Sequence, residues 1–310
     1  KEVIMQFKRY QHVEKLGTTE VEGIELGTCY IFPKLDGTNS SIWLDKDGNF
    51  CAGSRNRTLS LDNDNAGFYK QVLENQQFEG IRRCLKDNPN LRFFGEYLVP
   101  HSLKTYKQEA WNKFYIFDVL LSTSDVETQE VYFSYEQYQT LCEKYNINYI
   151  PCIRIIKNGI YDDFIHASQV NDYLIEAGKG IGEGIVIKNY NFTNKFQRTT
   201  WAKIVTSEFK EVHYKTMGAP EQENKLVEEE IVNGFCTQTL IEKTYQKILL
   251  DINGEWSSKL IPRLLETVYY DLIKEETYEF LKVFKFPTIN FKTLKMFVIQ
   301  KIKIIKKELF

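Results

Sequence analysis

The first two thirds of the chain alternates short apolar runs with turn-forming residues. Residues 29–32 and 40–44 have the length and the apolar or alternating character of β-strands. The turn-forming tetrapeptide Asp-Lys-Asp-Gly at 45–48 separates the second run from a third at 49–52, which predicts a β-hairpin. Four further runs are predicted to be strands, at 91–99, 113–121, 185–188 and 202–205.

Helical periodicity appears between these runs. Residues 66–86 place apolar side chains at helical spacing and stop at Asn-Pro-Asn (88–90), which predicts one helix. Residues 134–145 and 166–177 are predicted to be amphipathic surface helices. The segment 178–184 has four glycines in seven residues and is expected to be a loop.

The pattern changes after Gly-Ala-Pro at 218–220. From there to residue 310 the sequence is helical in period and has few turn-forming residues. We therefore expect a mixed α and β domain over residues 1–218 and an all-helical domain over residues 219–310.

Composition and charge narrow the classes of function. The 310 residues include 40 Lys and Arg against 42 Asp and Glu, a net charge of −2, which excludes a basic coat over the whole surface but allows a local basic groove. No run of about 18 apolar residues occurs, and the opening residues do not resemble a signal peptide. We therefore expect a cytoplasmic monomer with no membrane partner. The six cysteines lack CxxC pairing and are expected to be reduced thiols.

The sharpest chemical signal is the hexapeptide Lys-Leu-Asp-Gly-Thr-Asn at 34–39. Lys34 can act as a nucleophile only if part of it is neutral, which requires burial or cationic neighbours. Gly37 leaves room for close approach of the backbone to a ligand, and Asn39 offers both hydrogen-bond donors and an acceptor. A turn that carries a solvated lysine is the alternative interpretation of the same residues.

A second signal is Glu183, at the end of the glycine-rich loop. A carboxylate before a buried strand can hold a hydrated Mg²⁺ beside phosphates. Glu183 and Lys188 differ in strand parity, so Glu183 must lie in the loop or at a bulge if both serve one site. An exposed glutamate at the start of a strand is the alternative.

Other polar and aromatic residues stand within predicted strands. Alternation puts Trp201 and Lys203 on one face of the last strand, where Lys203 can reach a phosphate or simply be solvated. Glu96 is an acidic residue in an aromatic strand and needs a polar partner if it is buried; a ribose hydroxyl would suffice. Tyr115 and Phe117 are expected to share a face, on which either ring can stack on a base or pack in the core.

Arg55 and Arg57 follow the predicted hairpin. Their guanidinium groups suit contacts with phosphate. A salt-bridged surface turn is the alternative interpretation.

The order of these motifs resembles the covalent nucleotidyltransferase superfamily, which contains ATP-dependent polynucleotide ligases and mRNA capping enzymes. The extended motif at 34–39, the Ser-Arg pair at 54–55 and the short lead-in before Lys34 resemble RNA ligases of the nick-sealing RNA ligase 2 type, including RNA-editing ligases. The resemblance spans residues 29–207. It implies an α+β nucleotidyltransferase domain of antiparallel sheets with flanking helices, similar to ATP-grasp-like ligases.

The resemblance also implies an activity and its cofactors. Lys34 would take AMP from ATP with the help of Mg²⁺ or Mn²⁺, and the AMP would pass to the 5′-phosphate of an RNA end. A 3′-hydroxyl would then displace AMP and join the ends, either in a nicked duplex or between single strands. The nucleotide-binding residues that it implies are Asp36, Gly37, Asn39, Arg55, Glu96, Phe117, Lys188 and Lys203, and the metal-binding residue is Glu183.

More specifically, the resemblance puts Glu96 on the nucleoside sugar and stacks Phe117 on adenine. The last motif of the family usually has two lysines separated by one residue, and Trp201 occupies the first of these places here. Lys188, Lys195 and Arg198 are candidates for the missing charge.

The C-terminal domain is expected to engage RNA. Residues 282–310 contain eight lysines interleaved with apolar residues, which suits an RNA backbone, although a solvated surface helix would have the same composition.

Two other functions remain open from the sequence. A capping-type guanylyltransferase shares the lysine motif but would use GTP. An inactive relative that only binds RNA is the second alternative, because of Trp201.

Overall fold

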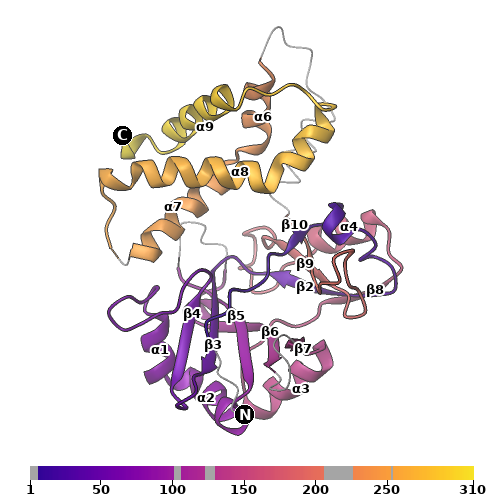
Figure 1. Cartoon of the computed structure of the whole chain (residues 1–310), viewed down its shortest axis with the longest axis vertical. Coiled ribbons are helices and arrows are strands. Elements are labelled where there is room, and N and C mark those ends of the chain that lie inside the picture. Colours follow the sequence, from indigo (N-terminus) through magenta and orange to yellow (C-terminus); the bar gives the residue numbers. More distant parts are fainter. Residues whose placement is uncertain (1–5, 101–105, 123–129, 206–225, 253) are drawn as a thin grey trace. The chain divides into compact units, whose positions relative to one another are not determined.

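The computed structural model of the chain describes residues 6–100, 106–122, 130–205, 226–252 and 254–310 (Figure 1). The chain divides into two compact units, residues 1–204 and 205–310, and each is described by itself. The predicted boundary after residue 218 lies within residues 206–225, outside the described residues, and stays a prediction.

The N-terminal unit is built from two five-stranded sheets. The first sheet has the order β4-β3-β5-β6-β7, with strands β3 (Thr38–Leu44), β4 (Phe50–Ser54), β5 (Leu91–Tyr97), β6 (Phe114–Ser122) and β7 (Glu130–Tyr132). The second has the order β1-β10-β9-β2-β8, with β1 (Glu14–Lys15), β2 (Thr28–Lys34), β8 (Arg154–Lys157), β9 (Gly184–Lys188) and β10 (Ala202–Val205). All pairings in the first sheet are antiparallel, as are those of β2 with β8 and β9, whereas β1 and β10 are parallel. The predicted strands and the β3–β4 hairpin are therefore confirmed.

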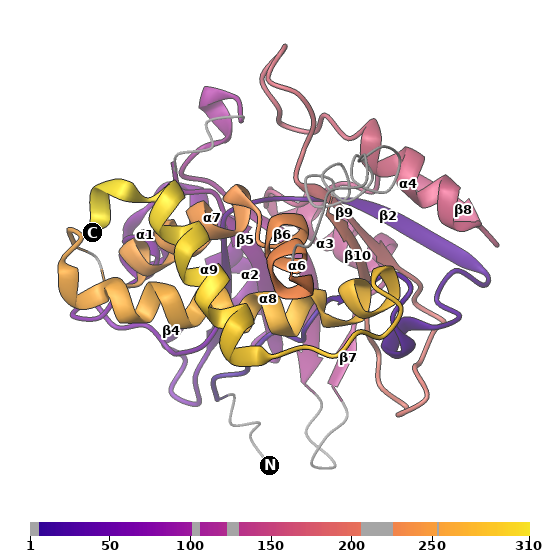
Figure 2. The same ribbon diagram turned by 90° about the horizontal axis from the view of Figure 1, so that it is seen from above.

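Helices flank these sheets and build the part of the second unit that is described after residue 225. The N-terminal unit has α1 (Phe68–Glu74), α2 (Glu79–Asp87), α3 (Tyr135–Tyr145) and α4 (Tyr161–Gln169). In the C-terminal unit, α6 (Val227–Phe235), α7 (Gln238–Ile252), α8 (Ile261–Val283) and α9 (Phe291–Ile305) pack around one apolar cluster (Figure 2). The predicted fold class, an α+β domain followed by a helical one, is thus confirmed.

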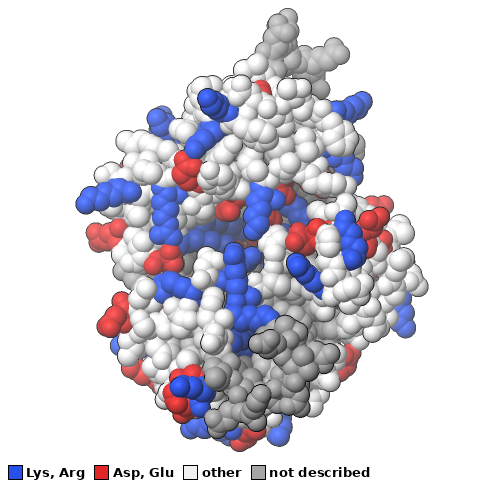
Figure 3. Space-filling view, viewed as in Figure 1, with Lys and Arg blue, Asp and Glu red and all other residues white. Residues whose placement is uncertain are grey.

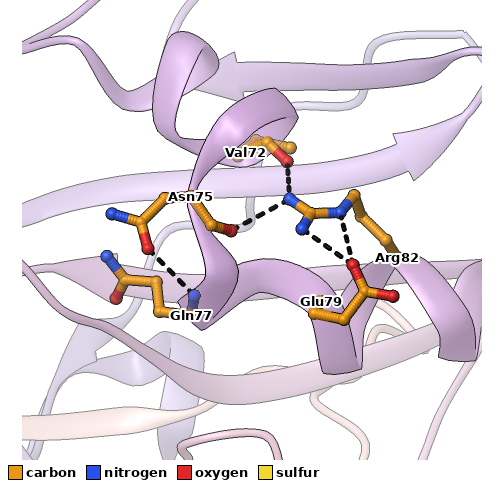
Figure 4. A network of polar contacts seen from close by, with 5 residues as sticks. All are labelled: Val72, Asn75, Gln77, Glu79 and Arg82. Atoms are coloured by element: carbon orange, nitrogen blue, oxygen red, sulfur yellow. Dashed lines mark hydrogen bonds and ion pairs between the residues drawn. The ribbon is translucent and has the colours of Figure 1, made fainter.

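The single helix predicted over residues 66–86 is wrong, because the segment forms two helices. Asn75 is extended (φ −79°, ψ 136°), and its side chain accepts a hydrogen bond from the backbone N–H of Gln77 in the 3₁₀ turn Gln76–Phe78. Arg82 of α2 reaches back and donates to the backbone carbonyls of Val72 (2.8 Å) and Asn75 (3.0 Å) (Figure 4). These bonds satisfy carbonyls that the end of α1 leaves without a helical partner.

The helix predicted over residues 166–177 is misplaced. It begins at Tyr161, where the Asp163 side chain accepts a hydrogen bond from the Ile160 N–H, and it ends at Gln169. The chain leaves the helix at Val170 (φ −105°, ψ 5°), and the positive φ of Leu174 (59°) is incompatible with a right-handed helix. The non-helical segment after Gln169 instead contacts the glycine-rich loop, as described below.

A β-bulge interrupts the pairing of β5 with β6. Phe94 pairs with Asp118 and Gly95 pairs with Ile116, so Phe117 is an extra residue on β6. The alternation expected to place Tyr115 and Phe117 on one face is therefore broken. Tyr115 is in the core beneath the helices, whereas the Phe117 ring contacts the Tyr10 ring at a centroid distance of 4.9 Å.

A buried polar cluster joins the bulged strand to the second sheet. The Asp118 carboxylate is fully buried, and it accepts hydrogen bonds from the Tyr10 hydroxyl (2.5 Å) and the Trp201 indole N–H (3.1 Å). Its other oxygen pairs with Lys188 Nζ at 2.7 Å, and Nζ also donates to the Phe117 carbonyl at 2.5 Å. Burial lowers the pKa of Lys188, an effect that Asp118 opposes. Each of these two buried charges is stabilised by the other, because an unpaired buried charge is strongly destabilising.

Surface properties agree with the composition. On the face seen in Figure 3, Lys and Arg side chains are interspersed with Asp and Glu. None of the described helices combines the length and apolar character needed to cross a bilayer. The six cysteines are free thiols, as predicted.

We predict that Arg82→Ala destabilises the N-terminal unit by about 1–3 kcal/mol, because it leaves carbonyls at the end of α1 unpaired. Equilibrium urea unfolding followed by tryptophan fluorescence measures this. Glu79→Ala is the matched control. Its carboxylate pairs with Arg82 at 2.9 Å but is 55% exposed, so its removal should cost much less. Equal destabilisation in the two variants would contradict this explanation of the α1–α2 junction.

We predict that Lys188→Met destabilises the protein by about 3–5 kcal/mol, because it leaves the Asp118 carboxylate buried and unpaired. Adding Asp118→Asn should recover part of this stability, since the amide is neutral and keeps a carbonyl oxygen that can accept from Tyr10 and Trp201. Urea unfolding of the two single variants and the double variant gives the coupling free energy. Strict additivity of the two effects would show that the ion pair is not their source.

Candidate active site

Lys34 and Glu183 meet where β2 and β9 pair. In the antiparallel register Lys34 lies opposite Gly184, so the residue before Gly184 is next to the lysine. The Lys34 Nζ and a Glu183 carboxylate oxygen are 2.8 Å apart, and the two side chains are 26% and 9% exposed. Glu183 lies in the loop before β9, as the parity argument required. The structure thus brings the candidate nucleophile and the candidate metal-binding residue into direct contact.

Asn171 holds the loop on both sides of Glu183. Its backbone carbonyl accepts from the Gly182 N–H and its side-chain amide donates to the Gly184 carbonyl, both at 2.7 Å. A side chain at Gly182 would bring a Cβ within 2.7 Å of this amide. Asn171 is 3% exposed, so its bonds are shielded from water. The Glu183 backbone is therefore fixed by a residue of the irregular segment that follows α4.

The turn after Lys34 is held by one residue of β5 and by one residue outside the two sheets. The Gly37 N–H donates to a Glu96 carboxylate oxygen at 3.0 Å, and the Asp36 N–H donates to the Tyr106 hydroxyl oxygen at 2.8 Å. A Cβ at residue 37 would lie 2.5 Å from the Tyr97 carbonyl oxygen, so only glycine fits. Asp36, Gly37 and Glu96 are in this way brought to one turn beside Lys34.

Asn39 and Arg55 lie near the ends of neighbouring strands of the first sheet. Asn39 is directly opposite Glu96 in the β3–β5 register, and paired residues project on the same face. Arg55 follows β4, where its guanidinium is 3.4 Å from the ring of His12. Contact of Arg55 with a phosphate stays a prediction.

Lys188 shares a face of the second sheet with Lys34, but its ammonium is engaged elsewhere. The register pairs Tyr30 with Lys188, Phe32 with Val186 and Lys34 with Gly184, which puts alternate residues on one side. The Lys188 Nζ lies 4.9 Å from the centre of the Phe32 ring, and the side chain is 2% exposed. This ammonium is bound to Asp118 in the structure. Its direct contact with a phosphate stays a prediction.

Trp201, which stands where the family motif usually has a lysine, is part of the core. Trp201 is fully buried, because its indole lies beside Asp118 and packs against Tyr190 at 5.4 Å. Trp201 comes directly before β10, whereas Lys203 lies within this strand and is half-buried.

The acidic side chains near Lys34 suit a divalent ion that keeps most of its water ligands. They do not suit an ion that is coordinated by protein side chains alone. Within the described ranges, no three or more His, Cys, Asp or Glu side chains are arranged as a metal site. Mg²⁺ keeps most of its waters and is usually held by one or two carboxylates together with substrate phosphates. Glu183, with Asp36 and Glu96 close by, fits this requirement.

Tyr106 and Asn171 are the residues at this site that the sequence interpretation missed. Tyr106 is a single tyrosine among polar residues, and nothing in the local sequence marks it. Asn171 and Asp172 form a turn-prone pair that could have ended the predicted helix over 166–177. Burial, followed by the negative charges of Asp36 and Glu183, raises the pKa of Tyr106 well above its usual value, so the hydroxyl keeps its proton.

A search of curated proteins gave no match. Among solved structures, a variant of Naegleria gruberi RNA ligase with ATP and Mn is 20% identical, with a TM-score of 0.49, and covers 67% of this chain and 58% of that one. The same ligase with pyrophosphate is 18% identical, with a TM-score of 0.48 and the same two coverages. This chain therefore matches little more than half of the Naegleria protein.

The family comparison covers the region that carries the site. The family model described as RNA ligase matches residues 27–205, more than half of the chain. The matched region begins just before β2 and ends with β10, so it contains Lys34, Glu183 and Lys203. The chain belongs to the RNA ligase family.

Proposed function

We propose that the chain is an ATP-dependent RNA ligase that joins 3′-hydroxyl and 5′-phosphate RNA ends through a lysyl-AMP intermediate. The observation that carries this proposal is the 2.8 Å contact of Lys34 with Glu183 at the start of the Lys-Leu-Asp-Gly turn. An amine nucleophile and a metal-binding carboxylate side by side are what phosphoryl transfer to a lysine requires.

The reaction runs in three displacements at phosphorus. Neutral Lys34 Nζ attacks the α-phosphorus of ATP, so that an N–P bond forms and the bond to pyrophosphate breaks. An oxygen of the RNA 5′-phosphate then attacks the AMP phosphorus, which frees the lysine and joins AMP to the RNA through a pyrophosphate linkage. The 3′-hydroxyl attacks the 5′-phosphorus, and AMP leaves as the phosphodiester forms.

The Glu183 carboxylate has two contacts in this proposal. In the structure it is bound to Lys34 Nζ at 2.8 Å. We propose that Glu183 also holds Mg²⁺ or Mn²⁺ when ATP binds; the ion supplies neutralisation of the phosphate charges. Once Glu183 is engaged by the ion, the Lys34 amine is no longer held by this carboxylate alone and can approach the α-phosphorus of ATP.

The remaining residues would bind the nucleotide and the RNA end. We propose that Glu96, already bound to the Gly37 N–H, accepts a hydrogen bond from the ribose, since each carboxylate oxygen has two lone pairs. Phe117 is half-buried beside Tyr10 and would stack on adenine. Asn39, Arg55 and Lys203 would contact phosphate groups, and Lys188, which is paired with Asp118, would lie near the phosphates.

We also propose that the helical domain engages the RNA backbone through α9. Lys292, Lys295 and Lys303 line a hollow on this helix together with Met296, Ile299 and Gln300. Glu266 pairs with Lys295, whereas neither Lys292 nor Lys303 forms an ion pair with a described residue. Lys306 is excluded from this surface, because it is 7% exposed and pairs with Glu242 and Glu308. The basic surface is therefore smaller than the run of eight lysines indicated.

We predict that the wild-type protein becomes covalently labelled by α-labelled ATP with Mg²⁺ and that Lys34→Ala lowers the labelling by about three orders of magnitude or more. Lys34→Ala should still seal a nicked RNA whose 5′ end is already adenylylated, because that step does not use the lysine as a nucleophile. Lys46→Ala, an exposed lysine in the β3–β4 turn, is the matched control and should label normally.

The outcomes separate the alternatives. Labelling by GTP in place of ATP would favour a guanylyltransferase. RNA binding without any adduct would favour an inactive relative. Either result would remove the ligase proposal.

We predict that Lys292→Glu combined with Lys303→Glu weakens binding to nicked duplex RNA. The slope of log affinity against log salt should also fall, by about 1 for each phosphate that the protein no longer neutralises. Fluorescence anisotropy at several salt concentrations measures both quantities. The control is Lys247→Glu combined with Lys259→Glu, which makes the same charge change at exposed residues elsewhere in the helical unit. Equal weakening in the two double variants would mean that net charge, not the α9 surface, governs binding.

A further inference from the structure

The Tyr106 hydroxyl is a buried polar group that the proposed reaction does not yet use. The side chain is 4% exposed, and its ring packs edge-on against Trp111 at a centroid distance of 5.2 Å. Its oxygen accepts a hydrogen bond from the Asp36 N–H at 2.8 Å. The tyrosine therefore binds the backbone two residues after the candidate nucleophile.

This hydrogen bond stabilises the turn that follows the nucleophile. Between Lys34 and the next strand, Thr38–Leu44, the backbone N–H groups of Asp36 and Gly37 are bound by Tyr106 and Glu96 respectively. A hydroxyl that accepts one hydrogen bond keeps its own proton for donation. Burial, and then the negative charges of Asp36, Glu183 and Glu96, raise the pKa of this hydroxyl, so it stays protonated.

The segment that positions Tyr106 is the same one that positions Glu183. Tyr106 forms an antiparallel bridge with Ile175, and the next residue, Lys107, donates its N–H to the Leu174 carbonyl at 2.9 Å. Asn171, four residues before Ile175, holds the backbone on both sides of Glu183. A single short stretch, 171–175, thus fixes the tyrosine above the nucleophile turn and the carboxylate beside the nucleophile.

We propose that Tyr106 is a positioning residue for lysine adenylylation: its hydroxyl fixes the turn that follows Lys34 and so aligns the amine with the α-phosphorus of ATP. The inference rests on the proposed function and assigns a role that acts through another residue. Displacement of a reacting group by about 1 Å can cost on the order of 100-fold in rate, so removal of one such bond should be visible in that step.

The test is Tyr106→Phe, which keeps the ring and its packing on Trp111 but removes the acceptor oxygen. Two rates are measured on the same preparation: covalent labelling by α-labelled ATP at saturating ATP, and sealing of a nicked RNA that already carries AMP on its 5′ end. Labelling should fall by about 10- to 100-fold with little change in KM for ATP, whereas sealing should fall by less than about 3-fold.

The ratio of the labelling rate to the sealing rate shows whether Tyr106→Phe disturbs the position of Lys34 or only lowers the amount of folded protein. A variant that is partly unfolded loses both activities in proportion, so the ratio does not change. Tyr69→Phe is the matched control: Tyr69 is half-buried in the same unit, and its hydroxyl donates to the Phe50 carbonyl at 3.1 Å, at the end of the β3–β4 hairpin opposite to the end that follows the Lys34 turn. It should leave the ratio at the wild-type value.

The outcomes distinguish this inference from the proposed function. If the wild type labels and Tyr106→Phe labels at the same rate, or if both rates fall equally, the positioning role of Tyr106 is overturned while the ligase proposal stands. If the wild type does not label at all, the proposed function fails and the inference fails with it.

Discussion

The antiparallel register of β2 with β9 is the constraint on which the candidate site depends. It sets Lys34 opposite Gly184, and a shift by one residue would turn Lys34 to the other face of the sheet. The register is itself secured by burial, because Ile31, Ile185 and Ile187 are almost completely shielded from water. Burial of the apolar face of these strands thus fixes the positions of Lys34 and Glu183, which are not part of the core.

A second constraint joins the two sheets beneath that site. Asp118 gathers a tyrosine, a tryptophan and a lysine around one carboxylate, and the lysine comes from the strand that Glu183 precedes. The bulge at Phe117 makes this arrangement possible, since the extra residue turns its carbonyl toward Lys188. The nucleotide-binding candidates Phe117 and Lys188 are consequently parts of one buried network, and substitution of either acts on the fold as well as on a ligand.

In the helical unit, some lysines are paired with glutamates of the same unit and others are not. Lys306 and Lys295 are paired within the unit with Glu242 and Glu266, whereas Lys292 and Lys303 line the hollow on α9 without an ion pair to a described residue. A balanced net charge of −2 is compatible with this arrangement, because a backbone-binding surface needs only a local excess of cations.

Local sequence was sufficient for the elements whose residues determine them directly. The β3–β4 hairpin follows from alternating strands around an Asp-Lys-Asp-Gly turn, and the loop before β9 follows from four glycines in seven residues. The motif order also identified Lys34 and Glu183 as candidates and required Glu183 to lie outside the regular strand. These features rest on backbone preferences and on the two-residue period of a strand, which are readable within a few positions.

Tertiary structure alone decided the rest. The break at Asn75 depends on Arg82, which approaches from the next helix, and the segment after α4 is held by the bond of Asn171 to Gly184, 13 residues later. Trp201 is part of the core, because its indole N–H donates to Asp118, 83 residues earlier in the sequence. Tyr106 reaches the Lys34 turn across 70 residues of sequence. Such contacts join residues that no local pattern relates, since their proximity arises only when the sheets and the segments between them pack together.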